Sequence, residues 1–319
     1  NNERDGICEL VKSNAKVIFK GACDLQIVCA YLESSNIIEE FTYVSDNNKW
    51  VEHHNNSVNY LSHPFLSKKE QDELLADCVF NDPKMFNTAI YDKDTALIFL
   101  STMVEPNLGI YRNKKTGIRI AFGESCYPLT DCNNWDLYIN KKVFTAENEF
   151  TKEWLEEFSS KYEFEGELTP NMILANAKLL LTKIAPHTKL CYFLGSEKPY
   201  LANTQENYKD RHIVYQQINK LFRDWAAVEE RVLLIDFNDY IRGQEDFTNN
   251  INHFVRRVYY DAATKINGYI AEIAGTKVKQ KSCIYLWFWS LVDRIGRTGF
   301  YQSRFWLIVR KMYVWVKRK

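Results

Sequence analysis

Short apolar runs alternate with longer segments of helical periodicity along most of the chain. Four runs, at 16–20, 96–100, 189–194 and 231–237, are nearly continuous in apolar residues, which is typical of strands buried on both faces of a parallel sheet. Between them, apolar residues recur every three or four positions, as they do in helices that cover such a sheet. The pattern therefore predicts an α/β fold with a mostly parallel sheet.

Local signals mark where some of these elements begin and turn. The sequence SKKE at 67–70 fits a capping box that opens a helix, and Thr169-Pro170 fits a helix start with proline in the first turn. A β-hairpin is expected across 109–123, with its turn at 114–117.

The composition changes after Gly275. From Lys281 onward the chain has nine Lys/Arg and one acid, together with four of its eight tryptophans. Its longest apolar run, 283–289, is far shorter than the roughly 20 residues that a spanning helix needs. We expect an α/β domain over 1–275 and a tail over 276–319 that forms two amphipathic helices, broken near Gly296 and Gly299.

Aromatic residues interleaved with cations are typical of helices that lie in the membrane interface. The tail is therefore expected to bind a membrane surface, and the alternative is a hydrophobic helix pair folded onto the body or onto a partner chain. The residues expected at this surface are Trp287, Trp289, Arg304, Trp306, Arg310, Lys311 and Trp315.

Charge and cysteine usage narrow the class of protein. The net charge is +0, which argues against a dedicated nucleic-acid binder, although the basic tail leaves 32 basic and 40 acidic residues for the rest of the chain. The eight cysteines form no CxxC pair and no zinc-ligand spacing, so they are expected to be reduced intracellular thiols rather than metal ligands. No signal peptide is visible at the start. These observations predict a cytoplasmic protein held peripherally on the inner membrane face.

The turn GACD at 21–24 joins the first strand to the first helix and places Cys23 in the first helical turn. A helix N-terminus stabilises a thiolate, and Gly21 allows a turn sharp enough for backbone N–H groups to face an oxyanion. The candidate base is His253, which precedes the last predicted helix, with Asn250 three residues before it. The alternative is that Cys23 packs in the core and that His253 only caps the helix.

This arrangement resembles the SGNH/GDSL hydrolase superfamily. Its first block is a strand, then G-x-[S/C]-D, then a helix, and its last block is D-x-x-H before the final helix, where this chain has NINH. The cysteine form is similar to proteins associated with bacterial capsular-polysaccharide biosynthesis. The resemblance implies a three-layer α/β sandwich in which Cys23 is the nucleophile and His253 is the base. Asn250 would orient the imidazole in place of the usual Asp.

The resemblance also implies an oxyanion hole, for which the family normally supplies a Gly and an Asn. The strand at 189–194 runs into GSEKPY and lacks the expected G-x-N-D, so the donors have to be sought more widely. The implied function is an acyltransferase or esterase for a bacterial cell-surface polysaccharide or its lipid-linked precursor, with no resident cofactor or metal and with acetyl-CoA as a candidate acyl donor. The residues expected to bind the oxyanion or substrate are Gly21, Asp24, Ser101, Asn107, Gly109, Gly195 and Ser196.

Two other interpretations stay open. Asp92 and Asp94 form a D-x-D, the motif with which glycosyltransferases hold a divalent ion and a sugar nucleotide, and it would indicate a metal-dependent glycosyltransferase or phosphotransferase of capsule assembly. This motif precedes an apolar run instead of following one, which favours a solvated turn. The second alternative is a non-catalytic glycan-binding module that kept the fold but lost the oxyanion donors.

Overall fold

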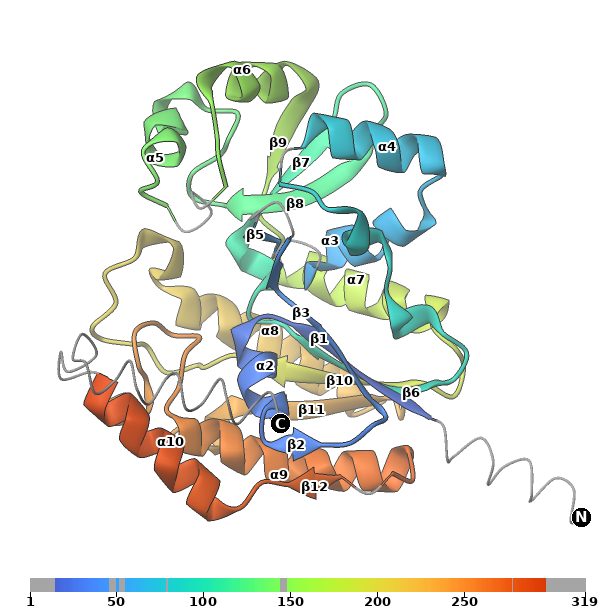
Figure 1. Cartoon of the computed structure of the whole chain (residues 1–319), viewed down its shortest axis with the longest axis vertical. Helices are drawn as coiled ribbons and strands as arrows, with labels where there is room; N and C mark the ends of the chain where they lie inside the picture. The colour runs from blue at the N-terminus through green and yellow to red at the C-terminus, as the bar shows by residue number, and fades with distance from the viewer. Residues whose placement is uncertain are drawn as a thin grey trace, which may run out of the picture.

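The computed structural model describes residues 15–45, 50–51, 55–78, 80–143, 148–276 and 278–296. Its centre is a parallel five-stranded sheet, and the four strands predicted from apolar runs all belong to it. The strands lie in the order β3 (Ile37–Phe41), β1 (Lys16–Gly21), β6 (Thr95–Ser101), β10 (Lys189–Leu194) and β11 (Val232–Asp236) (Figure 1).

This strand order reverses beside β1. The chain first adds β3 on one side of β1 and later adds β6, β10 and β11 on the other side. In open α/β sheets the carboxyl ends of the strands at such a reversal form a crevice where ligands bind. A ligand site is therefore expected at the carboxyl ends of β1 and β6.

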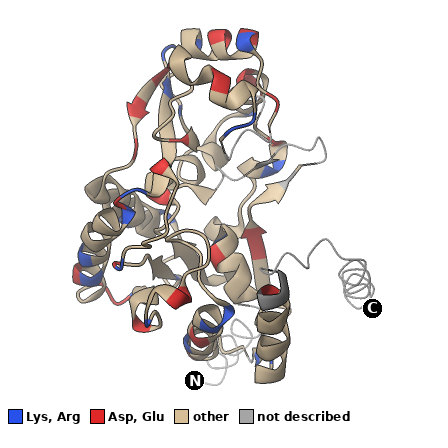
Figure 2. Ribbon diagram, turned by 90° about the vertical axis from the view of Figure 1, so that its left-hand side faces the viewer, with Lys and Arg blue, Asp and Glu red and all other residues tan. Residues whose placement is uncertain are grey.

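Helices cover both faces of the sheet, so the domain is the expected α/β sandwich (Figure 1). One face carries α2 (Cys23–Cys29) and α9 (Arg256–Ile273), and the other carries α7 (Pro170–Lys183) and α8 (Arg211–Ala226). The helix α10 (Cys283–Gly296) packs on the outside of α9 (Figure 1), and few of its residues are Lys, Arg, Asp or Glu (Figure 2). It is the first of the two tail helices that the sequence predicted.

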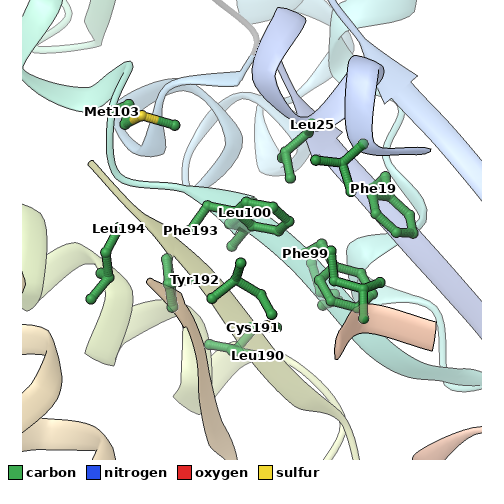
Figure 3. Packing of buried hydrophobic residues seen from close by; sticks show 14 of the residues in the cluster. Phe19, Leu25, Phe99, Leu100, Met103, Leu190, Cys191, Tyr192, Phe193 and Leu194 are labelled. Carbon is green, nitrogen blue, oxygen red and sulfur yellow. The ribbon is translucent and has the colours of Figure 1, made fainter. Parts of the chain in front are cut away.

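The core lies between the sheet and these helices. The rings of Phe19 and Phe99 stack with their centroids 4.4 Å apart, and Phe193 contacts Phe99 edge-on (Figure 3). All residues of β6 and nearly all of β1 and β10 are buried, which explains why their sequences are nearly continuous in apolar residues.

A second lobe with its own apolar cluster stands above the carboxyl edge of the sheet (Figure 1). Its centre is an antiparallel sheet of β8 (Arg119–Glu124), β7 (Leu108–Asn113) and β9 (Tyr162–Gly166). The predicted hairpin is confirmed as β7–β8. This lobe lies within the range 1–275 that the sequence predicted to be a single α/β domain. Around the sheet lie α4 (Lys68–Asp77), α5 (Trp135–Ile139) and α6 (Lys152–Lys161).

Two predicted helix starts are confirmed. Ser67 and Glu70 form a capping box at α4, and the side chain of Thr169 accepts a hydrogen bond from the N–H of Met172 at α7. Short pairs of strands complete the structure: β2 (Leu32–Glu33) with β12 (Lys279–Gln280), and β4 (Tyr43–Val44) with β5 (Trp50–Val51). The remaining helical segments are α3 (Ser57–Tyr60), η2 (His63–Phe65), η3 (Pro83–Phe86), η4 (Ala89–Tyr91), η5 (Glu105–Asn107), η6 (Cys132–Asn134), η8 (Glu206–Tyr208), η9 (Phe237–Asp239) and η10 (Gln244–Asp246).

Of the helices in the described part of the chain, none combines the length and apolarity needed to span a bilayer. Five residues that the sequence analysis assigned to a membrane surface, Arg304, Trp306, Arg310, Lys311 and Trp315, lie outside the described residues. The predicted break near Gly299 also lies there.

Candidate active site

Cys23 is the first residue of α2 and follows directly on the carboxyl end of β1. The strand turns into the helix at Gly21 and Ala22, with no loop between them. A Cβ atom on Gly21 would lie 2.2 Å from Cδ1 of the buried Leu25, so any side chain at this turn would displace Leu25. Within the described residues, Ala22 gives α2 no side-chain cap. The thiol of Cys23 is exposed at the crevice that the strand order predicts.

His253 faces this thiol from the loop before α9. Its Nε2 lies 2.8 Å from Sγ of Cys23, although the two residues are 230 positions apart in the sequence. The contact follows from the fold, because α9 packs beside α2. The loop itself is held by a bridge between Phe247 and Phe254 and by the N–H of Thr248, which donates to the carbonyl of His253.

The other ring nitrogen of His253 is held by Asn249. Nδ1 lies 2.7 Å from Oδ1 of Asn249, and an amide oxygen can only accept a hydrogen bond, so Nδ1 carries the proton. In the neutral ring this leaves the lone pair of Nε2 directed at the thiol. That tautomer is the one a general base needs.

The role expected for Asn250 therefore belongs to its neighbour. Oδ1 of Asn250 accepts from the N–H of Asn252 at 2.9 Å, and its carbonyl accepts from the N–H of His253 at 3.3 Å. Asn250 is buried and shapes the turn that presents the histidine, whereas the exposed Asn249 reaches the ring.

Burial shifts the pKa values of His253 and of the neighbouring Asp24. It lowers the pKa of His253 below the usual 6.5, and the charge of nearby Asp24 opposes this. Burial also raises the pKa of the Asp24 carboxyl, against the effects of the Ser101 hydroxyl and the N–H of Leu25. The imidazole is consequently favoured in its neutral form, which can accept a proton from the thiol.

Cys23 and His253 open onto a cavity of about 410 Å³. The α/β domain forms one wall with its β1–α2 turn, the segment after β6 and the histidine loop. The second lobe and the segment 204–208 contribute the rest of the lining. The polar lining is dominated by seven asparagines, Asn55, Asn56, Asn107, Asn207, Asn249, Asn250 and Asn252, and it also includes Glu124, Tyr127, Lys142, Glu206 and Tyr208.

Of the residues expected to bind the oxyanion or substrate, Asp24 and Asn107 line this cavity. Nδ2 of Asn107 donates to the carbonyl of Met103 at 3.1 Å. Ser101 is buried just behind the cavity at the end of β6, where its Oγ accepts from the N–H of Met103. The carbonyl of Gly21 accepts from Nδ2 of Asn55 at 2.6 Å.

The structure places three other expected residues away from the cavity wall formed by the described residues. Gly109 packs against Phe164 within the second lobe. The carbonyl of Gly195 accepts hydrogen bonds from two buried or half-buried amides, and Oγ of Ser196 accepts from the N–H of Lys198. Their contacts are those of the turn after β10.

The D-x-D motif lies at the opposite edge of the sheet. Asp92 and Asp94 precede β6, and both contact the ammonium of Lys16, at 2.8 and 3.0 Å. Among the residues that the structure describes, no group of three or more His, Cys, Asp or Glu side chains could hold a metal ion.

Of the seven asparagines of the cavity, Asn107 and Asn250 were predicted from the sequence as site residues. The other five, Asn55, Asn56, Asn207, Asn249 and Asn252, were not. Two adjacent asparagines precede the histidine, and spacing alone does not decide which one turns toward the ring. Asn55 and Tyr127 come from segments far in sequence from the β1–α2 turn, so only the folded chain brings them to the same cavity as Cys23.

No protein-family model matches the chain, and a search of the curated proteins finds no match either. What this site does has to be inferred from its geometry.

Proposed function

We propose that the protein is a cysteine-dependent acyltransferase or esterase, with Cys23 as the nucleophile and His253 as the base. The observation that carries this proposal is the 2.8 Å contact between Sγ and Nε2, made by a histidine whose Nδ1 is held by Asn249. A thiol, a base and a group that orients the base are the three parts that nucleophilic acyl transfer requires.

In the acylation step, Nε2 of His253 takes the proton of the Cys23 thiol. The thiolate attacks the acyl carbonyl carbon, and the electron pair of the C=O bond moves to oxygen. This oxyanion faces the first turn of α2, where backbone N–H groups point along the helix axis. When it collapses, the bond to the leaving alcohol or thiol breaks, and the leaving group takes the proton from Nε2.

In the second step, the acyl thioester on Cys23 is transferred. Nε2 removes a proton from water or from an acceptor hydroxyl, whose oxygen attacks the thioester carbonyl. Collapse releases the Cys23 thiolate, which recovers its proton from the imidazolium. Asn249 stabilises the imidazolium less than a carboxylate would, but a thiolate–imidazolium pair forms more readily than an alkoxide does, so a neutral partner suffices.

The lining of the cavity supports a polyhydroxylated substrate. Asparagine side chains offer both a donor and an acceptor, which matches sugar hydroxyls, and Tyr127 and Tyr208 provide flat apolar surfaces. With the resemblance described above, this favours a bacterial cell-surface polysaccharide or its lipid-linked precursor as the substrate. Acetyl-CoA suits the donor role because exchange between two thioesters is nearly balanced in free energy.

Turnover of an activated acetyl ester and of acetyl-CoA tests the proposal. We expect Cys23→Ala to abolish release of the leaving group and His253→Gln to slow it by at least 100-fold. Cys126→Ala is the matched control, because Cys126 is also an exposed thiol but does not line the cavity wall formed by the described residues. Equal rates for the wild type and Cys23→Ala would overturn the proposal and favour a non-catalytic glycan-binding module.

A further inference from the structure

The helix α10 is fixed to the body along one side. Oδ2 of Asp293 lies 2.6 Å from Nε of Arg256, and the guanidinium of Arg256 lies above the ring of Trp289, 5.1 Å from its centroid. The ring of Tyr285 meets that of Tyr31 edge-on. These contacts determine which side of the helix faces outward.

The outward side is apolar. Ile284, Trp287, Phe288 and Leu291 have exposed fractions of 74%, 65%, 45% and 37%. They follow the spacing i, i+3, i+4 and i+7, so they form one stripe along the helix. Elsewhere, Val228 at 83% and Leu201 at 76% lie on separate loops, and Leu179 and Ile213, both at 46%, lie on α7 and α8.

The sequence that follows α10 adds charge of one sign. Residues 297–319 contain seven Lys/Arg and no acid, and they are interleaved with Phe, Tyr and Trp. The single acid in 281–319 is Asp293, and Arg256 of α9 already pairs with it. The cations of this segment therefore have no acidic partner within their own segment.

We propose that the exposed stripe of α10, together with the basic segment 297–319, docks the protein onto an anionic membrane surface. An anionic bilayer offers apolar depth for the stripe and negative headgroups for the cations at the same place. The rest of the chain, with 40 acidic and 32 basic residues, could satisfy the charges but would leave the stripe in water. A second copy of the chain could cover the stripe but would bring like charges together.

Co-sedimentation of the full chain with vesicles tests this proposal. The wild type is expected to sediment with vesicles of phosphatidylglycerol and phosphatidylcholine, and to bind at least tenfold more weakly to pure phosphatidylcholine or in high salt. Trp287→Glu with Leu291→Glu is expected to weaken binding to the anionic vesicles at least tenfold. The matched control, Val228→Glu with Leu201→Glu, also replaces two exposed apolar side chains with Glu, but away from α10, and is expected to bind as the wild type does.

Trp287→Gln guards against misfolding, because the ring of Trp287 is largely exposed and Gln adds no charge. It is expected to retain the wild-type melting temperature and to bind less tightly. The proposal is overturned if Trp287→Glu/Leu291→Glu and Trp287→Gln both bind anionic vesicles as tightly as the wild type does. It is also overturned if the wild type does not sediment with anionic vesicles. Sedimentation velocity without lipid tests whether a second copy of the chain covers the stripe instead. A wild-type dimer that Trp287→Gln converts to a monomer would assign the stripe to that second copy and overturn the membrane proposal.

Discussion

The orienting role of Asn249 is open to direct test by Asn249→Ala. This change removes the acceptor that lies 2.7 Å from Nδ1 of His253, while the 2.8 Å contact between Nε2 and the thiol involves no atom of Asn249. Asn249 is exposed, so shortening its side chain leaves no buried cavity. The expected result is a folded protein whose imidazole rotates and changes tautomer more freely.

The size of the effect follows from the hydrogen bond that is lost. A hydrogen bond to a charged group contributes about 1.5–3 kcal/mol, and the imidazolium that forms during acylation carries the charge. At roughly 1.4 kcal/mol for each factor of ten, the rate of acylation should fall by about 10- to 150-fold. A carboxylate in the same place would contribute more, because it also stabilises the imidazolium electrostatically.

The assay is the rate at which an activated acetyl ester acylates the protein, measured across a range of pH. Asn249→Asp should restore the acceptor and raise the pKa of His253, which moves the acid limb of the profile to higher pH. Asn250→Asp provides the comparison, because Asn250 contacts the backbone of Asn252 and His253 but not the ring. A wild-type rate for Asn249→Ala, or an acid limb that moves only in Asn250→Asp, would refute this assignment.

Three further predictions concern pH and stability. Burial lowers the pKa of His253, so the acid limb of kcat/KM should lie below pH 6.5, and a pH–rate profile with its limb above pH 7 would contradict the neutral-base assignment. Burial raises the pKa of Glu105 from 4.5 to about 7, so stability present below pH 4.5 is lost as pH rises through 7. Glu105→Gln keeps an acceptor for Ser57, so its free energy of unfolding in urea should exceed that of the wild type by about 3 kcal/mol at pH 8 and by nothing at pH 4. An equal difference at the two pH values would contradict the raised pKa of Glu105. Lys20 and Glu40 form a buried ion pair, with Nζ 2.9 Å from Oε2. Lys20→Met leaves the Glu40 carboxylate without its cation and should lower the free energy of unfolding by about 3 kcal/mol, whereas Lys20→Met/Glu40→Gln should lower it clearly less. An unchanged urea midpoint for Lys20→Met would show the pair to be dispensable.

The parallel sheet could be predicted because its central strands are buried on both faces and therefore nearly continuous in apolar residues. The strand β3 was not predicted, because Glu39 and Glu40 interrupt its apolar run. Glu40 is accommodated by contacts distant in sequence, with Lys20 and with the N–H of Ala89, which no local pattern reveals.

The second lobe was not predicted for a related reason. Its apolar cluster joins side chains from two stretches of the chain that are separated by the strand β6, such as Phe80 and Phe122, whose rings stack 3.5 Å apart. Each stretch alone has an ordinary pattern. The lobe, and with it one wall of the cavity, becomes visible only when the two stretches meet.

In the candidate site too, some features could be predicted from local sequence and others depend on the tertiary structure. The position of Cys23 could be read from the strand, the glycine and the helix that surround it, and His253 from its place before the last helix. Which asparagine orients the imidazole depends on the φ and ψ angles of a four-residue turn. The contribution of the second lobe depends on tertiary packing, and neither is encoded in residue spacing.

The most direct test of the central claim is the intact mass of the protein after brief exposure to acetyl-CoA or an activated acetyl ester at neutral pH. The wild type is expected to gain a single acetyl group that peptide mapping locates on Cys23. Cys23→Ala should gain none at the cavity, and His253→Ala should gain it far more slowly. Equal labelling of all three proteins, or no labelling of any, would contradict a catalytic role for the pair.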